Sequence, residues 1–163
     1  SAASDVYKRQ PLKIMYPDTD FTLLDSLNKR IKFLDEVIRQ TSLKNIETLH
    51  GRAEDYAKNR DYREKFDVCV SRAVANLSTL SEYCIPYVKV GGCFIAYKAG
   101  QLDEELKSAE RAVKLLGGEI ADVHKLTLPD TDIDRTFVVI KKTAATSKKY
   151  PRKAGLPAKE PLQ

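Results

Sequence analysis

Charged side chains that could bind a ligand follow three apolar, strand-like stretches of this sequence. Asp25 closes the first stretch, and Ala53 and Glu54 come shortly after the second. Arg72 follows the third, which reads DVCVS at residues 67–71. Because ligands of an open α/β sheet bind outside the carboxyl ends of its strands, we expect these side chains to line one crevice. Carboxylates beside a permanently charged arginine suit a ligand with a ribose, a base and a charged end.

Each of these residues also has a simpler structural explanation, and the sequence leaves both explanations open. Asp25 stands before an expected helix, where an aspartate is a common N-cap. Glu54 and Asp55 could begin a helix whose macrodipole favours acids in its first turn. Arg72 could form an ion pair with one of the 23 acidic residues of the chain.

The pattern around these residues alternates between strand and helix from Pro11 onward. Alternating or continuous apolar residues predict parallel strands, and a spacing of three and four predicts helices. Ser26 is the expected N-cap of the helix that carries Lys29 and Arg30. The expected strands are 20–25, 46–50, 67–71 and 93–98, and the expected helices are 11–16, the helix from Ser26 through Ile38, 77–88 and 103–116.

The last two expected strands, residues 119–128 and 135–141, have no helix between them. They fit an antiparallel pair at the edge of an otherwise parallel sheet. Gly91 and Gly92 should form the turn into the strand at 93–98. Strands separated by helices predict an α/β fold, although the glycine-rich turn of a doubly wound nucleotide binder does not follow the first strand.

The composition is that of one globular domain. Its 163 residues, 42% hydrophobic and 31% charged, suffice for a real core. No apolar run approaches the roughly 20 residues of a membrane helix and no secretory signal opens the chain, so we expect a cytoplasmic protein without a membrane partner. Cys69, Cys84 and Cys93 lack paired spacing and fit reduced core thiols. His50 and His124 also lack ligand spacing, and we expect no metal site.

Basic residues are concentrated at the end of the chain. Residues 141–163 hold seven of the 28 lysines and arginines but one of the 23 acidic residues. Cations contact phosphates, a tyrosine can stack on a base, and prolines limit the entropy lost on ordering. We therefore interpret residues 143–163 as a basic tail for nucleic acid, with a flexible linker as the alternative. Its candidate RNA contacts are Lys148, Lys149, Arg152 and Lys153.

The first ten residues do not fit this organisation. Residues 1–10, SAASDVYKRQ, resemble the in-frame translation of a transposase-type sequencing adapter. Such segments are left out of fold reasoning, and a polar native N-terminus is the alternative. We therefore expect a non-native leader at 1–10, a folded domain at 11–142 and the tail at 143–163.

Taken together, these residues resemble the RsmG family, also called GidB, of small-subunit ribosomal RNA methyltransferases. The resemblance covers residues 11–163, and the combination of runs is specific where a single run would not be. The matching runs are PLKI at 11–14, LDSLNKR at 24–30 with FL at 33–34, GRAED at 51–55, SRAVA at 71–75, YVKVGG at 87–92 and the tail at 150–161.

The resemblance implies a class I, Rossmann-like sheet of an S-adenosylmethionine-dependent methyltransferase, acting on N7 of a guanosine in 16S rRNA. By the same resemblance Ala53, Glu54 and Arg72 fall on cofactor-binding positions, with Asp25 as the ribose acid. Arg72 would orient the cofactor or the target nucleotide and would not transfer a proton. The candidate rRNA contacts are then Lys29 and Arg30, together with the cations of the tail.

The sequence departs from the family at its start. The family's glycine-rich cofactor loop, first strand and N-terminal helical segment should precede Pro11, where adapter-like residues stand instead. The absent strand would lie between the strands ending at Asp25 and Ser71, and its loss would expose two strand edges. We therefore expect this chain to bind the cofactor poorly.

Two other functions remain open from the sequence. A nicotinamide-dependent oxidoreductase could use Asp25 on a ribose, but it would need a proton-transferring residue in a substrate domain. A non-catalytic α/β module could hold RNA through its basic tail. The expected partner is 16S rRNA or the small ribosomal subunit, and we expect the protein to be a monomer.

Overall fold

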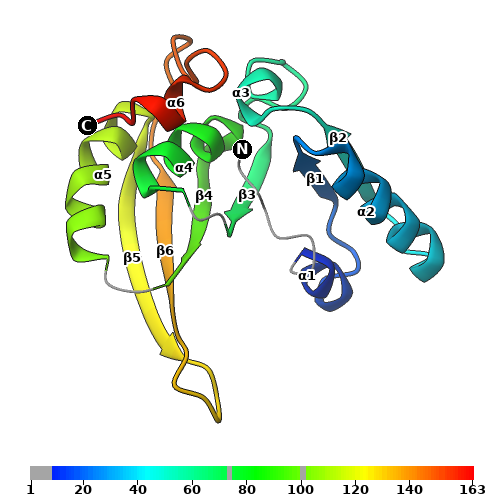
Figure 1. The fold of residues 1–163 in the computed structure, drawn as a ribbon. Coiled ribbons are helices and arrows are strands. Elements are labelled where there is room, and N and C mark those ends of the chain that lie inside the picture. The colour runs from blue at the N-terminus through cyan, green and yellow to red at the C-terminus, as the bar shows by residue number, and fades with distance from the viewer. Residues whose placement is uncertain (1–8, 73–74, 100–101) are drawn as a thin grey trace.

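The computed structural model describes residues 9–72, 75–99 and 102–163, and Figure 1 shows how their helices and strands are arranged. Residues 1–8 of the expected leader, and Ala73 and Val74 of the run SRAVA, lie outside the described part. The strands are β1 (Phe21–Asp25), β2 (Ile46–His50), β3 (Phe66–Ser71), β4 (Val88–Lys98), β5 (Gly118–Thr127) and β6 (Asp134–Lys142). The helices are α1 (Arg9–Met15), α2 (Asn28–Thr41), α3 (Ala53–Tyr56), α4 (Leu77–Cys84), a 3₁₀ helix (Ile85–Tyr87), α5 (Asp103–Leu115) and α6 (Leu156–Lys159). Within these residues, no helix has the length and apolar character needed to cross a membrane.

The described strands form two sheets. β1 pairs in parallel with β2, and the larger sheet has the order β3-β4-β6-β5. β3 and β4 are parallel, whereas β6 runs antiparallel to both β4 and β5. The predicted α/β fold, with parallel strands and an antiparallel pair at one edge, is therefore confirmed.

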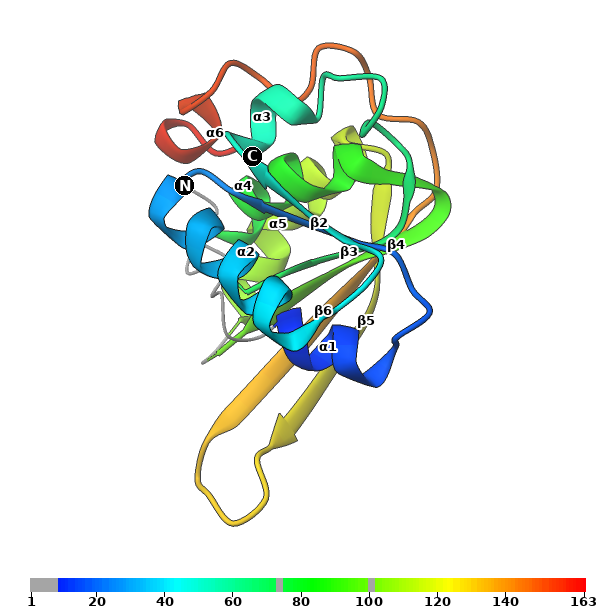
Figure 2. The same ribbon diagram turned by 90° about the vertical axis from the view of Figure 1, so that its right-hand side faces the viewer.

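The two sheets are interrupted between β1 and β3. In the described part of the chain, each of these strands has a strand partner on one side only. The expectation that a family strand is absent between them stays a prediction. Figure 2 shows α2 lying across β1 and β2, while the hairpin of β5 and β6 extends away from the body of the molecule.

Two expectations about local structure are wrong. Helix α2 begins after Leu27, not after Ser26, and Leu27 makes no side-chain cap. Gly91 and Gly92 lie within β4, where its register with β3 shifts, and do not form a turn before the strand. A Cβ on Gly92 would lie 2.3 Å from the carbonyl oxygen of Asp67, so this irregular stretch has no room for a side chain.

Two hydrophobic cores of unequal size support these sheets. The larger core joins α4 and α5 to one face of β4 and β6. Ala109 and Val113 of α5 are fully buried in it, as the helical spacing predicts. The smaller core lies between α2 and β1 and consists of Leu23, Ile31 and Leu34.

Residues 143–163, which we call the C-terminal segment, fold back onto the domain. Figures 1 and 2 both show the segment near α3 and α4 before it ends in α6. Tyr150, Pro151 and Pro157 are buried, and the Thr79 hydroxyl donates a hydrogen bond to the Pro157 carbonyl (3.0 Å). The segment therefore packs against the domain and is not a flexible linker.

Candidate ligand-binding site

A pocket of about 760 Å³ lies between the unpaired edges of β1 and β3. Every residue of both strands contributes to its lining, as do Ala53 and Glu54 at the start of α3. Asp25, the last residue of β1, also lines it. Three of the four predicted cofactor-binding residues thus face one cavity, whose volume is within the roughly 300–1,000 Å³ of small-molecule sites.

The fourth predicted residue, Arg72, is not among the residues that line this pocket. It directly follows Ser71, the last residue of β3, which lines the pocket and is 5% exposed. Arg72 itself is half-buried. Its role toward a ligand stays a prediction.

The carboxylate of Asp25 fits both of the interpretations that the sequence leaves open. Oδ1 accepts a hydrogen bond from the backbone N–H of Leu27 (2.8 Å), which is a capping-type contact before α2. Oδ2 lies 3.4 Å from Nη1 of Arg30. Because the same residue lines the pocket, the local contact does not exclude a ligand role.

The turn into α3 places Ala53 and Glu54 in the pocket wall. At Gly51 a Cβ would lie 2.6 Å from the ring of Tyr56, so any side chain there would displace this ring. Tyr87 donates a hydrogen bond from its hydroxyl to the Ala53 carbonyl (2.6 Å). Burial raises the pKa of Tyr87 far above its usual value, so the phenol stays protonated and remains a donor.

Glu54 is 3% exposed and has a partner from the far end of the chain. Its Oε1 accepts a hydrogen bond from the backbone N–H of Gly155 (2.8 Å). Among the described residues, Gly155 is the donor found on this carboxylate, and it bonds Oε1, so Oε2 carries no protein donor there. Glu54 and Gly155 are 101 positions apart, so no local sequence pattern predicts this hydrogen bond.

Arg152, a predicted RNA contact, forms an ion pair with the fully buried Glu82. Its Nη2 lies 2.8 Å from Oε2 of Glu82, and its Nε lies 3.0 and 3.1 Å from the two carboxylate oxygens. The backbone N–H of Arg152 donates to the same carboxylate (2.7 Å). The guanidinium thus holds the C-terminal segment on α4, and this geometry gives no support to an RNA contact.

The other predicted RNA contacts differ in exposure. Arg30 lies against Asp25 at the pocket, with its side chain 36% exposed. Exposed lysines can reach phosphates without reading sequence. The exposed candidates are Lys29 on α2 and Lys148, Lys149 and Lys153 on the C-terminal segment.

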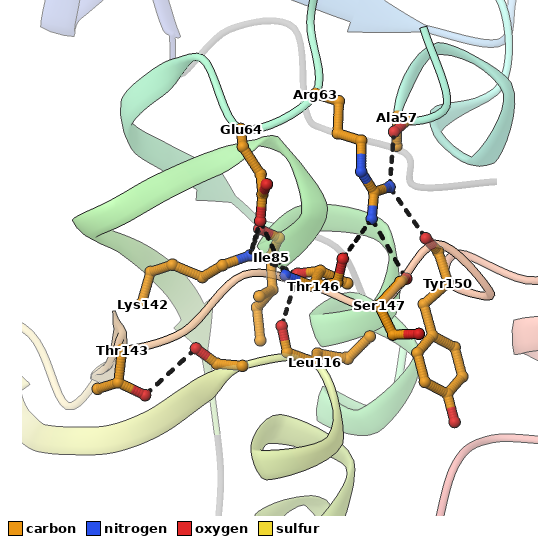
Figure 3. A network of polar contacts seen from close by, with 11 residues as sticks. Ala57, Arg63, Glu64, Ile85, Leu116, Lys142, Thr143, Thr146, Ser147 and Tyr150 are labelled. Atoms are coloured by element: carbon orange, nitrogen blue, oxygen red, sulfur yellow. Dashed lines mark hydrogen bonds and ion pairs between the residues drawn. The ribbon is translucent and has the colours of Figure 1, made fainter. Parts of the chain in front are cut away.

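Sequence reasoning missed Arg63, which joins the region after α3 to the C-terminal segment. Figure 3 shows its guanidinium among backbone carbonyl oxygens. Nη1 donates to the carbonyls of Ala57 (3.0 Å) and Tyr150 (2.9 Å). Nη2 donates to those of Thr146 (2.7 Å) and Ser147 (3.2 Å). Because the partners are carbonyl oxygens, which every residue carries, residue types could not have signalled this contact.

Lys142, 1% exposed, anchors the beginning of the same segment (Figure 3). Its Nζ lies 3.2 Å from the Glu64 carboxylate and 3.1 Å from the Ile85 carbonyl, and it contacts the Thr146 hydroxyl. The Thr146 N–H donates to the same oxygen of Glu64 (2.8 Å). Burial lowers the pKa of Lys142, and the neighbouring Glu64 offsets part of that effect.

Two solved structures that have a similar fold are named for S-adenosylmethionine or were determined with it. The structure of M. jannaschii TYW2 in complex with AdoMet has a TM-score of 0.61 and 11% identity, covering 81% of this chain and 62% of that one. The S-adenosylmethionine-dependent methyltransferase SibL, in its apo form, has a TM-score of 0.61 and 15% identity, covering 88% of this chain and 49% of that one. These likenesses establish the fold as the class I, Rossmann-like methyltransferase fold.

Curated relatives are far more similar in sequence. Ribosomal RNA small subunit methyltransferase G of Clostridium novyi is 53% identical over 152 residues, which are 93% of this chain and 63% of the relative. The protein of the same name from Lachnoclostridium phytofermentans is 56% identical over 152 residues. This chain therefore spans about 63% of the length of these relatives. The family model described as rRNA small subunit methyltransferase G matches residues 10–137, and the chain thus belongs to this family, GidB.

Proposed function

We propose that this protein transfers a methyl group from S-adenosylmethionine to N7 of a guanosine in 16S rRNA. The single observation that carries the proposal is the convergence of Asp25, Ala53 and Glu54 on one pocket at the ends of β1 and β2. Family membership supports the same chemistry and an rRNA substrate. A nicotinamide-dependent oxidoreductase finds no such support.

The residues of the pocket suit the proposed cofactor. Asp25 presents a carboxylate that can accept hydrogen bonds from ribose hydroxyls. Glu54, through its available Oε2, and the backbone of Ala53 can meet the polar edge of adenine. The apolar side chains of β1 and β3 that line the cavity would cover the base, including Leu23 and Val70.

The chemistry requires positioning more than proton transfer. When bound, S-adenosylmethionine supplies a methyl group activated by a sulfonium, and guanine N7 offers a lone pair with no proton to remove. The residues of this chain would hold the two reactants in line, and near-attack geometry can supply about 7–11 kcal/mol of the barrier. Arg72 would orient charged groups at the end of β3 through the planar set of N–H donors on its guanidinium.

A filter assay with labelled S-adenosylmethionine and small ribosomal subunits that lack the modification tests the proposal. The Clostridium novyi relative serves as the positive control for the assay. We expect label in 16S rRNA at guanine N7 with the relative and with this protein. Transfer by the relative but not by this protein would contradict the proposal.

We expect the chain as it stands to bind S-adenosylmethionine weakly. The pocket is bounded by β1 and β3, which share no strand ladder in the described residues, so its walls are poorly preorganised. Isothermal calorimetry should give a dissociation constant well above the micromolar range. A micromolar value would contradict this expectation.

The exposed lysines of the C-terminal segment give the proposed RNA contact a direct test. Replacing Lys148, Lys149 and Lys153 together by alanine should reduce the dependence of log K for RNA on log salt by about 2–3, since each phosphate contact contributes about 0.7–0.9. The matched control replaces three exposed cations of α5, Lys107, Arg111 and Lys114. Equal slopes for the wild type and the first variant would remove these lysines from the RNA interface.

A further inference from the structure

We infer that the C-terminal segment is a positioning element of the ligand pocket, acting through the hydrogen bond from Gly155 to Glu54. This inference rests on the proposed function, because it concerns the carboxylate assigned there to the adenine end of the cofactor. Gly155 does not itself line the pocket, whereas Glu54 does. The segment would therefore act on a ligand through Glu54.

The hydrogen bond sets how the Glu54 carboxylate is presented. Gly155 donates a hydrogen bond to Oε1 of Glu54 (2.8 Å), and rotation of the carboxylate away from Gly155 would break this bond. Water could not easily replace it, because Glu54 is only 3% exposed. A buried carboxylate without a donor is costly, so the observed rotamer is favoured. The same rotamer leaves Oε2 for a ligand donor, and a fixed acceptor binds a ligand better than a mobile one.

The position of Gly155 is itself fixed from both sides. Before it, Arg152 is bound to the buried Glu82 through its guanidinium and its backbone N–H. After it, Pro157 is buried and its carbonyl accepts a hydrogen bond from Thr79. These contacts come from α4, which also belongs to the larger core. The donor on Glu54 is thus held by the most extensively packed part of the molecule.

The backbone of Gly155 has the left-handed conformation, with φ of 86°, and a Cβ there would meet no atom within 4 Å. An L-alanine would fit sterically but would disfavour this φ, and the N–H would be pulled away from Glu54. Gly91 offers a matched control. It has φ of 91° and equally open space, but it lies in β4 and does not contact the pocket.

The test is a titration of the ¹⁵N-labelled chain with S-adenosylhomocysteine, followed by NMR because the affinity is expected to be weak. We expect G155A to raise the dissociation constant about tenfold, because a Glu54 carboxylate that has lost its fixed orientation binds the ligand less well, and G91A to leave it unchanged. The amide peak of Gly155 should also shift during titration of the wild type, although this residue does not line the pocket. A purely structural segment would not produce that shift.

A backbone ester at position 155, introduced by protein ligation, removes the N–H without changing φ, and it should weaken binding as G155A does. Two outcomes would overturn the inference while leaving the proposed function in place. One is an unchanged dissociation constant in the ester variant, and the other is a Gly155 amide peak that does not shift when ligand is added. If the wild-type chain shows no peak shift at any residue, even at the highest ligand concentration, both the inference and the proposed function would be overturned. Thermal melting of each variant separates loss of affinity from loss of fold.

Discussion

The two regions that face each other across the pocket are built very differently. The region of β1, α2 and β2 has a core of three buried residues, Leu23, Ile31 and Leu34. The region of β3 to β6 has a core of fifteen buried residues, to which α4, α5 and the C-terminal segment contribute. The first supplies Asp25 to the pocket, while Gly155, the hydrogen-bond partner of Glu54, belongs to the C-terminal segment that packs on the second.

This difference indicates which of the two pocket residues, Asp25 or Glu54, is held more firmly. A small core gives little hydrophobic stabilisation, so its region opens locally at lower cost than the whole protein. Asp25 therefore depends on a weakly packed region, whereas Glu54 is fastened to a strongly packed one. The following predictions test that contrast.

Removing the cation that anchors the C-terminal segment should have the largest effect. R152A leaves Glu82 buried without its ion-pair partner, and such losses typically cost about 3–5 kcal/mol in the free energy of unfolding. Urea denaturation of the chain measures this cost. The exposed neighbour Lys153 provides the control, and K153A should change stability by less than about 0.5 kcal/mol. Equal midpoints for both variants would mean that the segment is not an anchored part of the larger region.

A cavity in the smaller core should have a smaller and more local effect. L34A should cost about 2–3 kcal/mol, at the low end of leucine-to-alanine losses, because a small core can relax around the cavity. Hydrogen exchange should show faster exchange in β1 and β2 and unchanged protection in β4 and β6. Uniform loss of protection across both sheets would show instead that the two regions unfold as one unit.

Loss of the Arg63 contacts should come next in size. R63M removes donors from four carbonyl oxygens, and we expect about 1–2 kcal/mol of destabilisation because the site is partly exposed and water can replace some donors. Arg60 is an exposed arginine three residues earlier, and R60M serves as the control. Equal unfolding free energies for R63M and R60M would show that the bridge to the C-terminal segment contributes no stability.

The smallest effect concerns the pH dependence of stability. Burial lowers the pKa of Lys142 in the folded state below its usual value of 10.5. The unfolded chain therefore binds more protons at this residue between the two values, and stability should rise with pH across that window. As the pH rises toward 10.5, the free energy of unfolding of the wild type should therefore increase relative to that of K142M. A difference that is independent of pH would refute this.

The sequence predicted the parts of the molecule that local pattern controls. Period and length gave the strands ending at Asp25, His50 and Ser71, and the rule for parallel sheets placed Asp25 and Glu54 at one pocket. The start of α2 was misplaced by one residue: Leu27, not Ser26, stands at the N-cap, and the Asp25 carboxylate accepts the N–H of Leu27 in the turn before the helix.

The C-terminal segment could not be predicted in the same way. Its basic residues indicated a tail for RNA, yet Arg152 binds Glu82, 70 positions away. Gly155 reaches Glu54 through its backbone, which carries no residue-specific signal. Arg63 likewise donates to backbone carbonyl oxygens, including that of Tyr150, so neither composition nor residue spacing could predict this contact.

Because β1 and β3 are not paired with each other, a molecule bound between them would help to hold the two sheets together. In the described residues, no strand ladder links these two edges, so a small molecule touching both walls would tether them. An empty chain would then melt in two steps, the α2 side first, while a saturated chain would melt in one. The number of calorimetric transitions would consequently report occupancy, independently of any methyl transfer.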